Sequence, residues 1–76
     1  MVNYAKLKGL MAERGLTVVG LSHMLGVSRQ AASEKVNGKT KITLTEAQTI
    51  AKALHMDKEE RDAIFFNDFV KSEATG

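Results

Sequence analysis

Residues 17–41 read TVVGLSHMLGVSRQAASEKVNGKTK and contain two short helical patterns joined by a sharp turn. Thr17 is placed to cap the first helix, which should end at Gly26, because glycine adopts the left-handed backbone conformation without strain. Ser28 is placed to cap the second helix, expected over residues 29–36. This arrangement is typical of a helix-turn-helix, whose second helix can enter the major groove of DNA.

The predicted second helix has two chemically different faces. On a wheel of 3.6 residues per turn, Ala32 and Val36 share the face that would pack inward. The opposite face carries polar side chains: Gln30, Ser33, Glu34 and Asn37. Arg29 and Lys35 lie on the flanks, where long side chains can reach outward. Gln can pair with adenine, Arg with guanine and Glu with cytosine, so this face could read base edges.

The residues around this helix suit contacts to phosphate. Lys39, Thr40 and Lys41 follow the helix directly, and the hydroxyl of Thr17 lies beside the free N–H groups at a helix start. An ordinary solvated helix face is the alternative interpretation. The cluster of basic residues in this stretch favours a nucleic-acid partner, because Glu34 is the one acidic residue among them. Its members are Arg29, Lys35, Lys39 and Lys41.

Helix signals continue on both sides of this stretch. Asn3 is placed to cap a helix that ends at Gly15. Thr43 and Glu46 form a capping box that starts a fourth helix. Its apolar stripe consists of Leu44, Ala47, Ile50, Ala51 and Leu54. Asp57 and Glu60 resemble a second box, which opens a fifth helix through Phe65 or beyond. The chain is therefore predicted to be all-α, with a domain over residues 1–71 and a frayed tail over residues 72–76.

Composition excludes several classes of protein. The 76 residues contain no Cys, which suits a reducing cytoplasm, and no apolar run approaches the roughly 18 residues that span a bilayer. His23 and His55 stand apart from any ligand cluster, so we expect no metal, no cofactor and no enzymatic activity. We expect His23 to face solvent or phosphate and His55 to interact with the last carbonyls of the fourth helix. Met11, Met24 and Met56 are expected to fill the core.

The net charge of +2 is unevenly distributed. Residues 1–56 hold eight basic and three acidic residues, a net charge of +5. Residues 57–76 hold three basic and six acidic residues, a net charge of −3. This division indicates an anionic partner for the first part of the chain, although a chance asymmetry of a solvated surface is the alternative.

The sequence resembles the phage repressor and Cro type of helix-turn-helix domain, the XRE-like family. LGVSRQ (residues 25–30) and NGKTK (residues 37–41) are the closest matches, and the resemblance covers about residues 4–70. The longer pattern SEKVNGKTKIT, EAQTIAKALHM and EERDAIFF is most similar to small regulators from phages and prophages of Gram-positive bacteria. The resemblance implies a five-helix, lambda-repressor-like fold and a sequence-specific regulator of transcription that is cytoplasmic and nucleoid-associated in a bacterial host.

The resemblance also implies the roles of individual residues. By family position, the base contacts fall to Ser28, Arg29, Gln30, Ser33 and Glu34. Phosphate contacts fall near Thr17, Asn37, Lys39 and Thr40, to which we add Lys35 and Lys41. Three positions depart from the family pattern: Val18 stands where Gln is frequent, Gly20 where Glu is frequent, and Lys35 where an apolar core residue is frequent.

The predicted fifth helix suggests an additional contact. Three of the four aromatic residues lie within five positions, and its apolar side chains cover more of the helix than a one-sided core contact requires. One interpretation is a homodimer contact through Phe65, Phe69 and Val70 on a palindromic DNA operator. The other is that these side chains all cover a small core. A protein-binding module, such as an anti-repressor or antitoxin, remains the alternative to a DNA-binding function.

Overall fold

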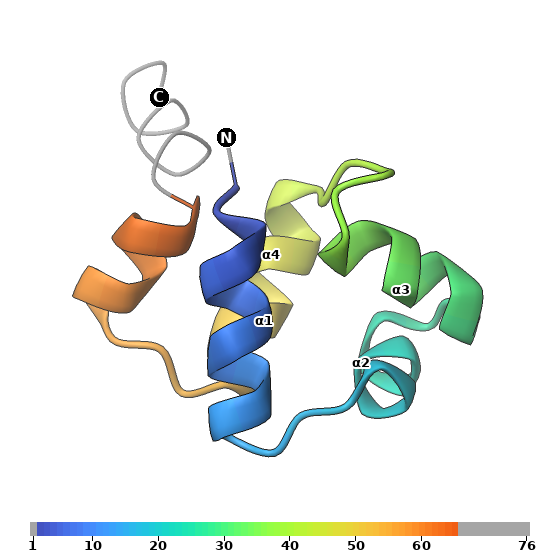
Figure 1. The fold of residues 1–76 in the computed structure, drawn as a ribbon, viewed down its shortest axis with the longest axis horizontal. Helices are drawn as coiled ribbons and strands as arrows, with labels where there is room; N and C mark the ends of the chain where they lie inside the picture. The colour runs from blue at the N-terminus through green and yellow to red at the C-terminus, as the bar shows by residue number, and fades with distance from the viewer. Residues whose placement is uncertain (1, 66–76) are drawn as a thin grey trace.

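The computed structural model describes residues 2–65 and contains helices with no strand in that range. Helices α1 (Tyr4–Glu13), α2 (Val18–Leu25), α3 (Arg29–Val36) and α4 (Leu44–Ala53) are followed by a helical segment at residues 58–65. In Figure 1, α2 and α3 lie together on one side of α1, and residues 58–65 lie on the other side. The all-α prediction is confirmed.

The predicted caps start every helix in the described range. The Asn3 side chain accepts a hydrogen bond from the Lys6 N–H at 3.1 Å, and Thr17 and Ser28 act in the same way on α2 and α3. The Thr43–Glu46 capping box has both of its hydrogen bonds. The second box is also formed, through the Glu60 N–H to Asp57 Oδ1 at 2.8 Å and the Asp57 N–H to Glu60 Oε1 at 3.2 Å. Each cap satisfies N–H groups that have no partner within their helix.

The residue with a left-handed backbone conformation after the helix is a glycine for α1 and α2 but not for α4. Gly15 and Gly26 follow α1 and α2 with φ of +75° and +66°, as their positions predict. After α4, His55 takes the left-handed conformation instead, with φ of +54°, and the Met56 N–H donates to the Ala51 carbonyl at 2.9 Å. This is the hydrogen bond that closes a Schellman motif. It places a residue with a Cβ where glycine is usual, at a cost in backbone strain.

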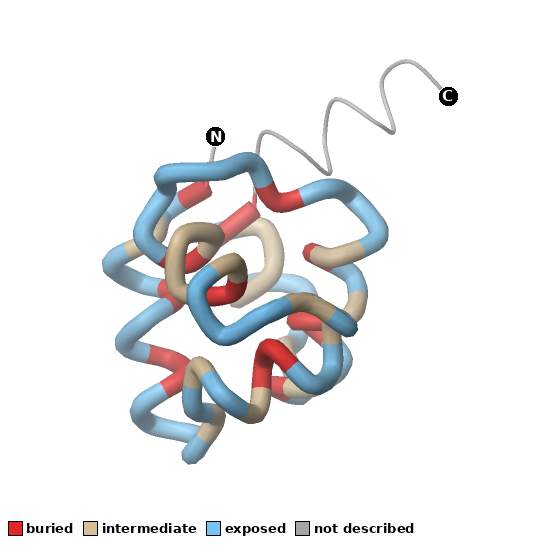
Figure 2. The backbone as a smooth tube through the Cα atoms, turned by 90° about the vertical axis from the view of Figure 1, so that its right-hand side faces the viewer, coloured by how far each residue is buried: buried red, intermediate tan, exposed pale blue. Residues whose placement is uncertain are grey.

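The core is formed by apolar side chains from every helix. In Figure 2 the buried residues form short stretches that alternate with exposed ones along the chain, as amphipathic helices require. The largest side chains with almost no exposure are Leu7, Leu21, Val36, Ile50, Leu54, Ile64 and Phe65. Two expectations are wrong. Met24, expected in the core, is 49% exposed because it lies on the outer side of α2, and Leu44 is 38% exposed because it is the first residue of α4.

Arg14 joins three separate parts of the fold. Its guanidinium donates to the carbonyls of Leu54 and His55, at 2.7 and 3.3 Å, and to both carboxylate oxygens of Glu60, at 3.0 and 2.5 Å. Arg14, at the end of α1, thus satisfies the two carbonyls that directly follow α4. Arginine can do this because its planar fork of donors serves several acceptors at once. The sequence predicts that the imidazole of His55 serves the end of this helix, and that prediction is wrong.

The chain that precedes α1 is tied to the last described residues. The Asn3 N–H donates to the Ile64 carbonyl at 2.8 Å, and Val2 is buried in the same cluster as Ile64 and Phe65. The first and last described segments therefore brace each other, on the side of the molecule away from α3 (Figure 1).

Candidate nucleic-acid interface

The turn between α2 and α3 sets the direction in which α3 leaves the core. Gly26 has the left-handed conformation, and the Val27 N–H returns to the Ser22 carbonyl at 3.0 Å. Val27 is half-buried and packs against the core, so it occupies the angle between the two helices. The Ser28 hydroxyl accepts from the Ala31 N–H at 3.1 Å, which starts α3 immediately after the turn.

The structure confirms the two faces that the sequence predicts for α3. Ala32 and Val36 are 0% and 2% exposed and face the core. Arg29 and Gln30 are exposed at the start of the helix, while Ser33 and Glu34 are half-buried. Ser28 is exposed, although its hydroxyl is already an acceptor in the cap. The first turn of α3 therefore presents the side chains that are freest to meet a partner.

The start of α2 lies close to the end of α3. Thr17 is exposed, and its hydroxyl accepts from the Gly20 N–H at 3.0 Å. A cavity of about 300 Å³ separates this helix start from Val36 and Asn37. The other N–H groups of the first turn of α2 have no acceptor within the helix, which is the usual basis for phosphate binding at such an end.

Asn37 has a partner that sequence reasoning missed. Its side-chain amide donates to the Ser33 carbonyl at 2.8 Å, and its oxygen accepts from the ammonium of Lys8 at 2.9 Å. Lys8 is exposed and comes from α1, and it also lines the cavity beside Thr17. No local pattern could have indicated this contact, because Lys8 is 29 residues away in the sequence.

The loop that follows α3, residues 37–43, carries four exposed side chains that the sequence predicts to contact phosphate: Asn37, Lys39, Thr40 and Lys41. Gly38, the second residue of the loop, has a φ of +79°, and a Cβ there would lie 3.0 Å from the ring of Tyr4. A side chain is therefore excluded both by the backbone conformation and by the aromatic ring. The Lys39 N–H donates to the Glu34 carbonyl at 2.9 Å, which keeps the start of the loop against α3.

Lys35 does not reach outward as predicted. Its ammonium lies 3.0 Å from Glu46 Oε1 and 3.1 Å from the Lys41 carbonyl, and its side chain is 14% exposed. Burial raises the pKa of Glu46, but the hydrogen bonds from Thr43 and Lys35 outweigh it and hold that pKa below its ordinary value. The ammonium of Lys35 is thus neutralised inside the protein, and this differs from the expectation of a phosphate contact.

The remaining cations make the α2–α3 side of the molecule positive. Arg29, Lys39 and Lys41 are exposed there, together with Lys8 from α1, and Glu34 is the half-buried acidic residue among them. His23 is exposed on α2, as expected. A surface of this charge attracts polyanions over a distance of about 8–10 Å at moderate salt.

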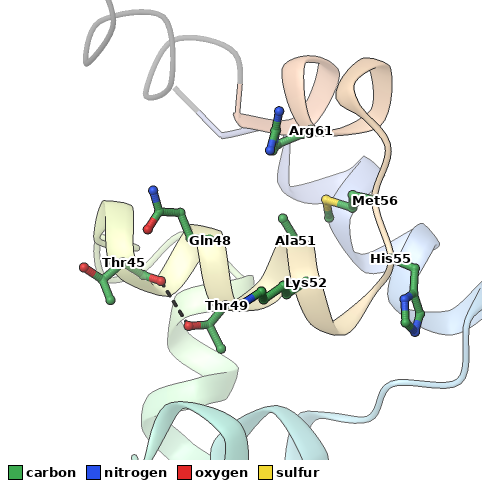
Figure 3. Close-up of a pocket in the computed structure, with 8 residues that line it drawn as sticks. All are labelled: Thr45, Gln48, Thr49, Ala51, Lys52, His55, Met56 and Arg61. Atoms are coloured by element: carbon green, nitrogen blue, oxygen red, sulfur yellow. Dashed lines mark hydrogen bonds between the residues drawn. The ribbon is translucent and has the colours of Figure 1, made fainter. Parts of the chain in front are cut away.

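A second concavity lies away from these residues, between α4 and residues 58–65 (Figure 3). Its volume is about 800 Å³, and its wall has one imidazole, two cationic side chains and no carboxylate. The lining residues are Thr45, Gln48, Thr49, Ala51, Lys52, His55, Met56 and Arg61.

Within residues 2–65, no three His, Asp or Glu side chains are grouped so as to hold a metal ion. None of the helices in the same range has the length and apolar character needed to cross a bilayer.

The residues predicted to form a dimer contact divide into two groups. Phe65 is 0% exposed and belongs to the core cluster with Leu7 and Ile50, so it serves the single chain and is not presented to a partner. Phe69 and Val70 lie outside the described residues. The structure therefore corrects the role of Phe65, and the other two positions stay predictions.

Comparison with known sequences identifies the same region. A family model described as a Cro/C1-type HTH DNA-binding domain matches residues 6–60, which include most of α1, all of α2, α3 and α4, and the start of the last helix. No curated protein and no solved structure matches the chain.

Proposed function

This chain belongs to the family of Cro/C1-type HTH DNA-binding domains, and we propose that it is a sequence-specific regulator of transcription that reads the major groove of duplex DNA with α3. The observation that carries the proposal is the contrast along this helix. Arg29 and Gln30 are exposed beside a positive surface, whereas Ala32 and Val36 hold the opposite face in the core. A helix anchored in this way can present its first turn to base edges.

The surrounding groups support a fixed position on the duplex. Thr17 and the start of α2, the exposed residues of the loop 37–43, and Lys8 surround the reading helix with donors and cations. Such contacts to phosphate orient a protein on DNA without reading sequence. In this arrangement α3 supplies the specificity and its neighbours supply most of the affinity.

The finer form of the proposal is a phage or prophage repressor, or a Cro-like regulator, that binds a palindromic operator as a homodimer. One helix-turn-helix reads only a few base pairs, which discriminates poorly against the sites of a whole genome. Two copies on half-sites about 10 base pairs apart would remedy this. With Phe65 in the core, the proposed self-contact through the last helix rests on Phe69 and Val70.

Binding to duplex DNA of random sequence tests the basic function. We expect micromolar affinity at low salt that falls steeply as salt is added, because phosphate neutralisation releases counterions. A protein-binding module on the same fold would show no such salt dependence. Selection of bound sites from a random duplex library then tests specificity, and a selected pool that stays random would contradict the assignment of α3 as a reading helix. Half-site spacing in the pool, together with sedimentation of the free protein, tests the homodimer.

A further inference from the structure

The Lys35–Glu46 ion pair lies at the base of the loop 37–43. The Lys35 ammonium donates to Glu46 Oε1 at 3.0 Å and to the Lys41 carbonyl at 3.1 Å. The same carboxylate oxygen accepts the Thr43 N–H at 2.9 Å. One cation and one carboxylate therefore join α3, the far end of the loop and the first turn of α4.

This pair is poorly placed to serve either surface charge or net stability. The side chains of Lys35 and Glu46 are 14% and 19% exposed, so little of either charge faces solvent. The cost of removing two charges from water offsets most of their attraction at such a site. What the pair does determine is geometry, because the ammonium can satisfy both acceptors only when loop and helices keep their positions.

The loop is held at both ends while its middle stays exposed. At its start, the Lys39 N–H bonds to the Glu34 carbonyl at 2.9 Å. At its end, the Lys41 carbonyl is held by Lys35, and Ile42 is buried at 9% exposure. The side chains of the exposed residues between these points, residues 39–41, project from a backbone that is already ordered.

We propose that Lys35 and Glu46 are positioning residues for DNA binding, which hold the loop 37–43 in the conformation that its side chains need to contact phosphate. The inference rests on the proposed function. Its physical basis is conformational entropy: a loop that is ordered in the free protein does not lose that freedom when DNA binds. Lys35 thus promotes binding through the Lys41 backbone without touching DNA itself.

Replacement of Lys35 by Met, which keeps the length of the side chain, tests this role. We expect binding about tenfold weaker on every duplex sequence, the loss that follows from ordering about one residue on binding. The dependence of affinity on salt should keep its slope, because no phosphate contact is lost. In the matched variant Lys39→Met, affinity should fall and the slope should fall by about one unit. Lys35→Arg should restore most of the affinity, since arginine can donate to both acceptors.

Each other result has a definite meaning. A slope that falls by about one unit in Lys35→Met would show a direct phosphate contact and overturn the proposal. Unchanged affinity would show that the pair is merely structural. Failure of the unmutated protein to bind DNA would instead overturn the proposed function, so the two failures are distinguishable.

A second variant covers the case in which Lys35→Met does not fold. Glu46→Gln weakens the pair but keeps an oxygen that can accept the Thr43 N–H, so the capping box survives. Glu59→Gln is the matched control, because it removes the same charge from an exposed position in the last helix. We expect Glu46→Gln to bind DNA about tenfold more weakly than Glu59→Gln. Equal affinity of the two variants would contradict the positioning role.

Discussion

Two ion pairs fix different parts of this molecule: one joins helix ends within one half, and the other joins the two halves beside a loop. In the half formed by α1, α4 and residues 58–65, Arg14 bonds to Glu60 and to carbonyls at the end of α4. These contacts join helix ends to one another. In the other half, formed by α2, α3 and the loop 37–43, Lys35 bonds to a loop carbonyl and, across the boundary, to Glu46 in the first turn of α4. That contact orders a segment that carries exposed cations.

The comparison separates stability from recognition. The first half, which we call the scaffold half, contains Leu7, Ile50 and Phe65, three of the largest fully buried side chains. The second half, the reading half, exposes most of the residues predicted to contact DNA. We therefore expect substitutions in the scaffold half to change the free energy of unfolding, and substitutions on the surface of the reading half to change affinity for DNA.

The largest effect should come from Phe65→Ala in the scaffold half. Removal of a fully buried phenyl ring should lower the free energy of unfolding by about 3–5 kcal/mol, most of the stability of a domain this small. Met24→Ala in the reading half is the control, because its side chain is 49% exposed and its loss should cost about 0.5 kcal/mol or less. Urea unfolding followed by circular dichroism measures both. A loss in Phe65→Ala as small as that in Met24→Ala would place Phe65 outside the core and support its predicted role in a dimer contact.

A smaller effect, on affinity for DNA, is expected when a glutamine is removed from the reading half but not from the scaffold half. Gln30→Ala on α3 should weaken binding to the preferred site by about 1–3 kcal/mol and relax the preference at one base pair. Gln48 on α4 is also exposed but lies in the scaffold half, so Gln48→Ala should leave binding unaltered. Titration of both variants against selected and scrambled duplexes measures the difference. If Gln48→Ala weakens binding as much, the division into two halves is wrong.

Substitution of the left-handed residue that follows a helix should change the free energy of unfolding in opposite directions in the two halves. His55→Gly after α4 should raise the free energy of unfolding by about 0.5–1 kcal/mol, because relief of strain exceeds the entropy cost of glycine. Gly26→Ala after α2 should lower it by about 1–2 kcal/mol through strain alone, since nothing lies within 4 Å of the added Cβ. Thermal unfolding gives the sign of both changes. A loss of stability in His55→Gly would show that the imidazole makes a contact that outweighs the strain.

The smallest effect should be confined to acid conditions. Bonding to Arg14 and to the Asp57 N–H lowers the pKa of Glu60, and the pKa of Glu46 is lowered by hydrogen bonds that outweigh its burial. Because both values are depressed in the folded state, their contribution is complete above the unfolded pKa and is lost as pH falls through the folded pKa. We expect the decline in stability below about pH 4.5 to be shallower in Glu60→Gln and in Glu46→Gln. Urea midpoints between pH 3 and pH 7 measure it, and a decline as steep as in the unmutated protein would refute both assignments.

The helix boundaries could be predicted because capping acts over a few residues. Thr17 and Ser28 each bond to an N–H three positions later, and Thr43 forms its box with Glu46 at the same spacing. The inward face of α3 could be predicted for a similar reason, since Ala32 and Val36 lie one helical turn apart. The base and phosphate contacts themselves stay predictions.

Other predictions were wrong where the deciding partner came from a distant part of the chain. Lys35 is expected from its flank position to reach outward, but its ammonium lies 3.0 Å from Glu46 Oε1 and its side chain is 14% exposed. The imidazole of His55 was assigned to the end of α4, where Arg14 supplies the donors. No local pattern in the sequence points to Lys8, since its place beside Asn37 depends on how α1 meets α3.

The sequence by itself determined the all-α class, the starts and ends of the helices and the helix-turn-helix, because caps, glycines and helical periodicity are local properties of the chain. Only the tertiary structure decided which charged side chains remain available to DNA. The sequence predicts a phosphate contact for both Lys35 and Lys39, yet the side chain of Lys35 is 14% exposed and paired while Lys39 is exposed. The physical reason is that the strength and accessibility of a charge depend on burial and on partners within a few ångströms, and those are set by the packing of whole helices.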